Sequence, residues 1–323
     1  MPKGSFSRRL RGLGLLGINE RNASYTLRRN PRSHFPLVDD KLRTKSLCAE
    51  AGIPTAKLLA SAHRIGDLSA MMDDLSACSS FVLKPAHGAM GNGIIVIKDR
   101  DGDRICRSGG AWMTTDDLRH HASGIVSGLY ALGGQHDAAF VEERLEVHPE
   151  LAAISTDGVP DYRFIIYRGV PVMAMARLPT ARSTGRANLH HGAVGVGIDL
   201  ATGLSSHAVI DSTPTRIHPD TGERVVGRRM PAFERSLEIA VAATDLTGLG
   251  YVGADVVVDA ERGPVVLELN ARPGLAVQIA NRAGLRPRLE AVDEDLRENL
   301  PLASRLRLGR RIAYHEEQQS VRA

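Results

Sequence analysis

Two carboxylates and an amide occupy matching positions of one predicted β-hairpin late in the chain. The hairpin turns midway between residues 261 and 262, so residues whose numbers add to about 523 should face each other. Asp255 and Glu268 meet that condition, and Asn270 shares their face because strand side chains alternate between two faces. Such an oxygen-only set suits Mg²⁺ or Mn²⁺ holding nucleotide phosphates. The alternative, a solvent-facing polar side, is disfavoured because Lys and Arg are absent from that face until Arg272.

A glycine-rich segment follows a short apolar strand in the first third of the chain. The strand at 81–84 leads into AHGAMGNG, with Gly88, Gly91 and Gly93. Glycines let the backbone approach a polyphosphate, and consecutive N–H groups of such a loop can bind an anion. Lys84 would add a compact positive charge, and it is one of only six lysines among 41 basic residues. The alternative is an ordinary hairpin turn beside an exposed lysine.

Two other glycine patterns do not indicate a cofactor site. Residues 12–17 and 248–253 both match G-x-G-x-x-G. The first has no strand before it, and the second follows a helix and precedes a strand, which reverses the order of a dinucleotide fold. No G-x-x-x-x-G-K-[ST] motif occurs, so a P-loop is excluded.

The elements that must position these residues alternate between hairpins and helices. A loop-rich start is expected up to residue 36, loops around one strand over 179–206, and short helices at the end. The apolar residues Val256, Val258, Val265, Leu267 and Leu269 should take the opposite face of the hairpin from the carboxylates. This pattern predicts an α+β fold with antiparallel sheets rather than a doubly wound sheet. Helices are predicted over 39–51, 67–77, 114–132 and 231–248, and strands over 81–84, 93–98, 138–143, 161–167, 170–177 and 192–198, besides the hairpin at 250–270.

Composition narrows the setting of the protein. The 323 residues include three scattered cysteines without a C-x-x-C pair, which argues against a disulfide framework or a zinc knuckle. No apolar run approaches the roughly 18 residues of a membrane helix, and no signal peptide is recognisable, so a cytoplasmic protein is expected. Residues 1–32 carry eight basic side chains and one acid. This basic arm could bind an anionic partner, or it could be a solvated segment.

In order and spacing, these motifs resemble the ATP-grasp ligases over about residues 37–284. The nearest branch is similar to the RimK-like α-L-glutamate ligases. The resemblance implies two α/β subdomains with antiparallel sheets that grip ATP between them. It divides the chain into a basic N-terminal segment (1–38), an N-terminal ATP-grasp subdomain (39–140), a C-terminal ATP-grasp subdomain (141–284) and a helical tail (285–323).

The resemblance also implies roles for individual residues. Lys41 and Lys84 match two lysines that contact the ATP phosphates, and the metal ligands of the family fall on the three hairpin residues already named. Arg163 and Arg177 resemble the region around the phosphates and the acyl acceptor, and Arg272 is a further candidate for clamping an oxyanion. The remaining matches to nucleotide-binding positions are His87, Gly88, Gly91, Gly93, Glu142, Glu143, Leu145 and Asn188.

Together these observations predict an ATP-dependent carboxylate–amine ligase that uses Mg²⁺ or Mn²⁺ and forms an amide through an acyl phosphate. It would add glutamate or another amino acid to a peptide or small molecule, and it could act as a homo-oligomer. Two other classes stay open: an ATP-grasp kinase for small molecules, and a nucleotide-binding regulator without catalysis. A product assay separates them, because only a ligase releases ADP in a reaction that needs both an acid and an amine.

Overall fold

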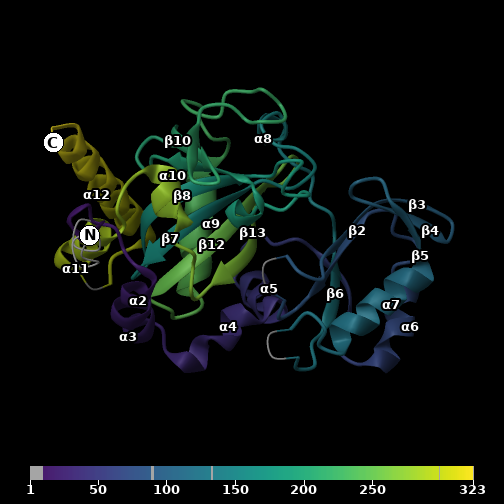
Figure 1. The fold of residues 1–323 in the computed structure, drawn as a ribbon. Helices are drawn as coiled ribbons and strands as arrows, with labels where there is room; N and C mark the ends of the chain where they lie inside the picture. The colour runs from purple at the N-terminus through teal and green to yellow at the C-terminus, as the bar shows by residue number, and fades with distance from the viewer. Residues whose placement is uncertain (1–9, 89–90, 132–133, 298, 323) are drawn as a thin grey trace, which may run out of the picture.

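Two antiparallel sheets form two lobes that lie side by side (Figure 1). The structure is a computed structural model that describes residues 10–88, 91–131, 134–297 and 299–322. Most connections between neighbouring strands are hairpins, so the expected α+β class with antiparallel sheets is confirmed. The segment boundaries expected at 38, 140 and 284 stay predictions.

The smaller sheet has six strands in the order β1-β6-β2-β3-β4-β5. Helices α6 (Leu68–Asp74) and α7 (Thr115–Val126) cover one face, where Leu83 and Ile97 are buried in the core. Thr114 is the N-cap of helix α7, where its side chain and that of Asp117 cap each other's backbone, and the helix ends earlier than expected, at residue 126. The strands are β1 (Leu58–Ala62), β2 (Phe81–Pro85), β3 (Ile95–Asp101), β4 (Arg104–Arg107), β5 (Trp112–Thr114) and β6 (Ala139–Glu142).

The larger sheet has seven strands in the order β11-β10-β9-β8-β7-β12-β13. Helix α9 (Phe233–Asp245) packs on one face, and α10 (Ala276–Asn281), α11 (Arg286–Asp295) and α12 (Leu302–Arg322) cover part of the other. The strands are β7 (Asp161–Tyr167), β8 (Val170–Leu178), β9 (Val194–Ile198), β10 (Ser205–Ile210), β11 (Thr213–Thr215), β12 (Tyr251–Asp259) and β13 (Gly263–Asn270).

One face of the larger sheet changes from apolar to charged along its strands. On β7, Tyr167 and Ile165 pack with the helices that cover this face, and Arg163 and Asp161 follow at every second position. The same change occurs on β8, where Met173 and Met175 precede Arg177, and on β12, where Tyr251 and Gly253 precede Asp255. The charged ends of three adjacent strands therefore lie together, beyond the part of this face that the helices cover.

The N-terminal segment differs from the expected loop-rich arm. Residues 18–39 form short helical pieces: α2 (Ile18–Glu20), a π-helical turn η1 (Arg21–Thr26), α3 (Leu27–Arg29), a 3₁₀ turn η2 (Arg32–His34) and α4 (Pro36–Asp39). The Asn30 amide donates to the carbonyls of Tyr251 (2.8 Å) and Ala271 (3.0 Å), and buried Arg21 donates to the Pro273 carbonyl (2.6 Å). The expectation of a loop is wrong for residues 18–36, because these contacts with the larger sheet stabilise helical turns that the local sequence does not predict.

Several further features were not expected from the sequence, among them strands β1, β4 and β5 of the smaller sheet. Strands β10 and β11 extend the larger sheet, the short helix α8 (Pro149–Ala152) follows the link between the lobes, and the last helix, α12, is 21 residues long. Helix α5 (Lys41–Glu50) places Cys48 in the core of the larger sheet, although Lys41 at its start reaches toward the smaller lobe. In the described residues, no helix has the length and apolar character needed to span a bilayer.

Candidate active site

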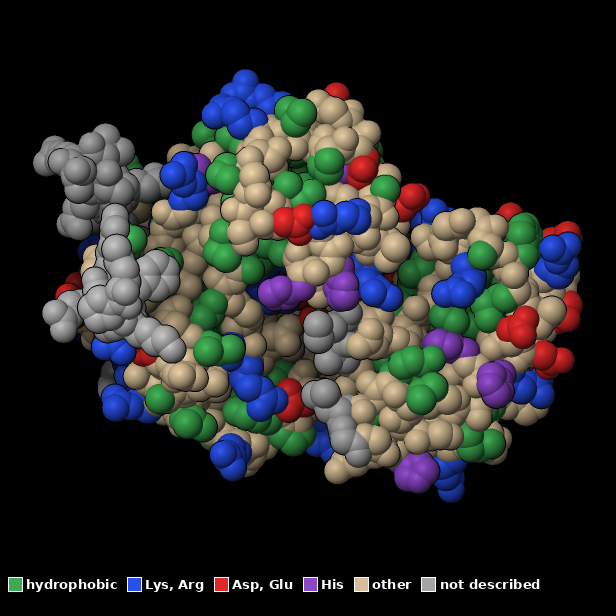
Figure 2. Space-filling view, viewed as in Figure 1, with side chains coloured by type: hydrophobic (Ala, Val, Ile, Leu, Met, Phe, Trp, Pro, Cys, Tyr) green, Lys and Arg blue, Asp and Glu red, His purple; other side chains and the backbone are tan. Residues whose placement is uncertain are grey.

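A cleft of about 790 Å³ lies between the two lobes. Figure 2 shows a hollow between them, with basic and histidine side chains at its rim. The smaller sheet lines the cleft with Val82, Lys84 and Val96, and the larger sheet contributes Asp255 and Glu268. The link between the lobes, residues 142–147, also lines it. A positive and a negative group of residues thus approach one space from opposite sheets.

Glu142 at the end of β6 is held between two lysines. Its Oε2 lies 2.7 Å from Lys45 Nζ, and its Oε1 is in direct contact with Lys84 Nζ. The Glu142 side chain is only 3% exposed. Burial alone would raise the pKa of this carboxyl, but Lys84 and Lys45 outweigh burial and hold the pKa below its usual range. Glu142 is therefore a buried carboxylate that stays ionised.

Lys41 begins helix α5 and holds the first part of the glycine-rich loop. Its Nζ donates to the carbonyl of Gly88 at 2.6 Å, and its backbone N–H donates to the Ala86 carbonyl at 3.1 Å. Asp40 caps the helix by accepting from the N–H groups of the next turn. The cap fixes the start of α5, and with it the lysine that meets the loop.

Close contacts or a positive φ explain the glycines of this loop. A Cβ on Gly88 would lie 2.2 Å from Pro85 Cγ, and one on Gly93, where φ is +78°, would lie 2.7 Å from Tyr130 Cγ. Gly91 also has a positive φ of +77°, and a Cβ there would lie 3.7 Å from Arg186 Cδ across the cleft. Residues 89–90, which belong to the predicted phosphate loop, lie outside the described residues.

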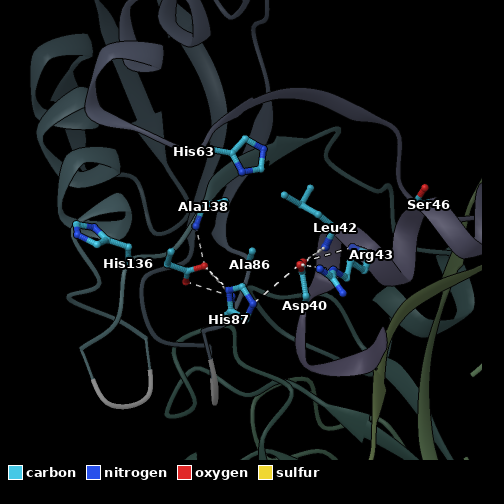
Figure 3. Close-up of a pocket in the computed structure, with 10 residues that line it drawn as sticks. Asp40, Leu42, Arg43, Ser46, His63, Ala86, His87, His136 and Ala138 are labelled. Atoms are coloured by element: carbon cyan, nitrogen blue, oxygen red, sulfur yellow. Dashed lines mark hydrogen bonds and ion pairs between the residues drawn. The ribbon is translucent and has the colours of Figure 1, made fainter. Parts of the chain in front are cut away.

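His87 faces a second, smaller pocket of about 560 Å³ rather than the cleft (Figure 3). Its Nδ1 lies 2.7 Å from Asp137 Oδ1, and its Nε2 lies 4.0 Å from Asp40 Oδ2. Asp137 also accepts from the backbone N–H groups of His87 (3.1 Å) and Ala138 (2.7 Å). This carboxylate fixes the start of the loop, so the structure places His87 as an anchor beside the loop.

Asp255 lies at the centre of a chain of four buried ionised groups. Arg163 on β7 donates to both of its oxygens, with Nη2 at 2.6 Å from Oδ2. Arg177 on β8 donates to Asp255 Oδ2 (2.6 Å) and forms a two-bond pair with Asp161 (both 2.6 Å). The expectation that this face of the hairpin lacks basic residues before Arg272 holds, and strands β7 and β8 bring Arg163 and Arg177 alongside it from the rest of the sheet.

The pKa shifts of the two aspartates follow from these contacts. Burial would raise the pKa of Asp255, but Arg163 and Arg177 outweigh burial and hold it below its usual range. Burial raises the pKa of Asp161 to about 6, although its partner Arg177 acts in the opposite direction. Asp255 is therefore an anion kept in place by two guanidinium groups.

The hairpin has the predicted register at the candidate metal ligands. Asp255 pairs with Glu268, and Asn270 pairs with Gly253 on the same face. Asn270 Nδ2 donates to Glu268 Oε1 at 2.8 Å. A bulge follows Asp255, so that Leu267 turns into the cleft instead of taking the opposite face as expected.

The bulge also moves Val265 to the face predicted for the carboxylates. Val265 packs with Val257, Ala56 and Leu145, whereas Val256 and Val258 pack under α9. The expected alternation of side chains between the two faces of β13 is therefore wrong for Val265, before the bulge, and right for Leu269, after it.

The predicted site residues divide between the cleft and its surroundings. The residues that line the cleft are Lys41, Lys84, Gly88, Gly91, Glu142, Glu143, Leu145, Asn188, Arg177, Asp255 and Glu268. Arg272 is not among the described residues that line it: its Nη2 lies 3.3 Å from Asp39 Oδ2, and its guanidinium stacks on Phe35. The Glu143 carboxylate is paired with Arg262 (2.5 Å), and Asn188 accepts from the His190 N–H (3.0 Å).

Three cleft or near-cleft residues were missed by the sequence analysis. Lys45 lies one helical turn after Lys41, and its spacing could have shown that both reach the same side of α5. Asp161 faces Arg177 across the β7–β8 hairpin, but the turn at residues 168–169 alone would pair it with Ala176, because a bulge between Ile165 and Ile166 shifts the register by one residue. Arg186 lines the cleft from a loop without regular structure, and no sequence signal distinguishes it from the other arginines.

The family of the chain follows from its sequence as a whole. Residues 20–294 match the family described as sugar-transfer associated ATP-grasp. The chain belongs to this family. The two antiparallel sheets with a cleft between them are the ATP-grasp fold. The nearer likeness to the RimK-like ligases stays a prediction, because the match is to another group of ATP-grasp proteins.

Several solved ATP-grasp structures are similar to this chain at low identity. The ATP-grasp ligase PsnB with a minimal precursor is 15% identical with a TM-score of 0.42, over 86% of this chain and 64% of that one. The D-alanine–D-alanine ligase of Bacillus anthracis with ATP is 14% identical with a TM-score of 0.43, over 89% and 70%. The D-cycloserine synthetase DcsG is 13% identical with a TM-score of 0.42, over 88% and 73%.

These structural similarities do not indicate the activity of the chain, since all three TM-scores are below 0.5. This ATP-grasp chain also spans less than two thirds of the length of PsnB. No protein with a curated description matches the chain.

Proposed function

We propose that the chain is an ATP-dependent carboxylate–amine ligase that releases ADP. The observation that carries the proposal is the cleft in which Lys41 and Lys84 of one side face Asp255 and Glu268 of the other. In the proposed reaction, a substrate carboxylate oxygen attacks the γ-phosphorus of ATP, and ADP leaves. An amine then attacks the acyl carbon, the amide C–N bond forms and phosphate departs. Such chemistry depends on positioning and charge neutralisation more than on an acid–base residue.

The nucleotide would lie across the cleft from the link between the lobes to the glycine-rich loop. The apolar side chains Val82 and Val96 on one sheet and Leu267 on the other suit the two faces of a purine. The link residues from Glu143 to Leu145 would bind its edge, since both carboxylate oxygens of Glu142 are paired with Lys45 and Lys84. At the other end, Lys41, Lys84 and the N–H groups of the loop would bind the phosphates.

The donor set of the hairpin fits a hard divalent cation. Asp255, Glu268 and Asn270 offer carboxylate and amide oxygens from one face, and Asn270 already contacts Glu268. In the described part of the chain, no three His, Cys, Asp or Glu side chains form a metal cluster, and the set proposed here consists of two carboxylates and an amide. A bound Mg²⁺ or Mn²⁺ would neutralise charge on the transferred phosphoryl group. Arg163 and Arg177 would hold Asp255 in place rather than clamp substrate.

The family description suggests which acids and amines to test. Its link to sugar transfer adds sugar acids and amino sugars to the amino acids and peptides expected from the sequence. Among the described residues, Arg186 forms no ion pair with a carboxylate, and it lines the loop side of the cleft, so it is our candidate for binding the substrate carboxylate.

The test is a coupled ADP-release assay with ATP, Mg²⁺ and a panel of acids and amines. A ligase releases ADP only when both an acid and an amine are present, and mass spectrometry finds the amide. ADP release with a single phosphorylated product indicates a kinase instead. Tight ATP binding without turnover in any mixture indicates a regulator.

A further inference from the structure

Three ionised side chains meet at the back of the cleft, and one of them has no contact with the cleft itself. Lys84 and Glu142 line it, whereas Lys45 is absent from the described residues that do so. Lys45 Nζ lies 2.7 Å from Glu142 Oε2 and donates to the Ala56 carbonyl at 2.7 Å. The side chains of Lys45, Lys84 and Glu142 are 11%, 12% and 3% exposed. One buried carboxylate is thus shared by two ammonium groups.

The sum of these charges decides what a phosphate group would meet. Lys84 and Glu142 alone would form a neutral pair, and a neutral pair attracts a polyphosphate weakly. With Lys45 the group carries a net charge of +1. Because the site is largely buried, solvent screens this charge less than it would at the surface.

The placement of Lys45 is costly unless its charge is used. Burial lowers the pKa of Lys45, and contact with Glu142 opposes that shift. An apolar residue at this helix position would avoid the cost of burying an ammonium group. Lys45 also follows Lys41 by one helical turn, so both lysines project from the same side of α5.

We propose that Lys45 is a positioning residue that neutralises Glu142 and thereby leaves the charge of Lys84 available to the nucleotide phosphates. The proposal rests on the proposed ATP-binding function. Lys45 does not contact the ligand. It acts through Glu142, whose carboxylate is held between Lys45 and Lys84. A unit charge about 10 Å from a phosphate, at an effective dielectric constant of about 20, changes affinity roughly tenfold.

The test measures ATP affinity by calorimetry with Mg²⁺ at low ionic strength in four proteins: wild type, Lys45→Gln, Glu142→Gln and the double variant. Lys45→Gln makes the group neutral and should weaken ATP binding roughly tenfold. The double variant again carries a net charge of +1, on Lys84, and should recover most of that loss. Glu142→Gln alone should bind ATP at least as tightly as the wild type.

Recovery in the double variant separates a charge role from a packing role. If Lys45 only supports the fold, a second change at its partner leaves ATP binding as weak or weaker, and that result overturns the proposal. Unchanged affinity in Lys45→Gln overturns it as well. If Lys45→Gln fails to fold, Lys45→Arg should bind like the wild type, and weaker binding in Glu142→Gln overturns the proposal. Absence of ATP binding in the wild type instead refutes the proposed function.

Discussion

Replacing Asp255 or Glu268 by its amide removes one negative charge from the same hairpin pair, yet only the change at Asp255 should strongly destabilise the fold. Asp255 is 0% exposed and accepts three hydrogen bonds from Arg163 and Arg177. Asp255→Asn leaves two buried guanidinium groups short of their counter-ion, which costs about 3–5 kcal/mol in comparable buried pairs. Glu268 is only partly buried and accepts one hydrogen bond from Asn270, which a glutamine can still accept.

The local charge balance treats the two variants alike. Two arginines face three carboxylates, and either change removes the one negative charge in excess, so the lost hydrogen bonds from Arg163 and Arg177 make the difference. We expect the free energy of unfolding of Glu268→Gln to stay within about 1 kcal/mol of the wild type. Asp255→Asn should lower the melting temperature by roughly 5–10 °C. Both variants should lose turnover by orders of magnitude if these oxygens hold the metal.

Thermal melts without nucleotide or metal, followed by circular dichroism, measure this difference directly. Each variant serves as the control for the other, since both exchange a carboxylate for an amide on facing residues. Equal melting temperatures for Asp255→Asn and the wild type would refute the argument from the arginine contacts. A strongly destabilised but active Glu268→Gln would show that this carboxylate is structural.

Three further predictions concern the other side of the cleft. Lys84→Ala should abolish the increase in melting temperature that ATP and Mg²⁺ produce in the wild type, since a ligand stabilises a protein only by binding its folded state; an unchanged increase contradicts the assignment. Gly88→Ala should weaken ATP binding because its Cβ would lie 2.2 Å from Pro85 Cγ. The control Gly66→Ala, which has open space around it, should bind ATP like the wild type, and equal affinities of the two variants would show that the loop conformation does not matter for ATP binding. The pKa of Glu142 in the folded protein lies below its ordinary value of 4.5. The ionised carboxylate therefore stabilises the fold at pH values above 4.5, and this stabilisation is lost as the pH falls through the folded pKa. Between about pH 5 and about pH 3, urea unfolding should show a smaller decrease in the free energy of unfolding for Glu142→Gln than for the wild type. Equal decreases would contradict the pairing of Glu142 with Lys45 and Lys84.

The hairpin shows what the sequence could predict at the site. Its register follows from the turn and from alternation, which are local, and so Asp255 was paired with Glu268 correctly. The bulge that turns Leu267 into the cleft depends on packing against other strands, and alternation alone gives the wrong face.

Contacts between distant segments were beyond local patterns. The strand order that sets β7 and β8 beside β12 brings Arg163 and Arg177 to Asp255, and no spacing in the sequence states that order. The N-terminal helical turns likewise depend on tertiary hydrogen bonds such as those of Asn30 with Tyr251 and Ala271. Helices with clear caps, such as the one that Asp40 starts, were predicted because their signal lies within a few residues.

A crystal structure with a non-hydrolysable ATP analogue and Mn²⁺ tests the central claim most directly. The anomalous signal of Mn²⁺ locates the metal independently of the nucleotide. We predict the metal on Asp255, Glu268 and Asn270, with the triphosphate between it and the lysines Lys41 and Lys84. A nucleotide bound outside the cleft, or Mn²⁺ away from these three side chains, would contradict this account.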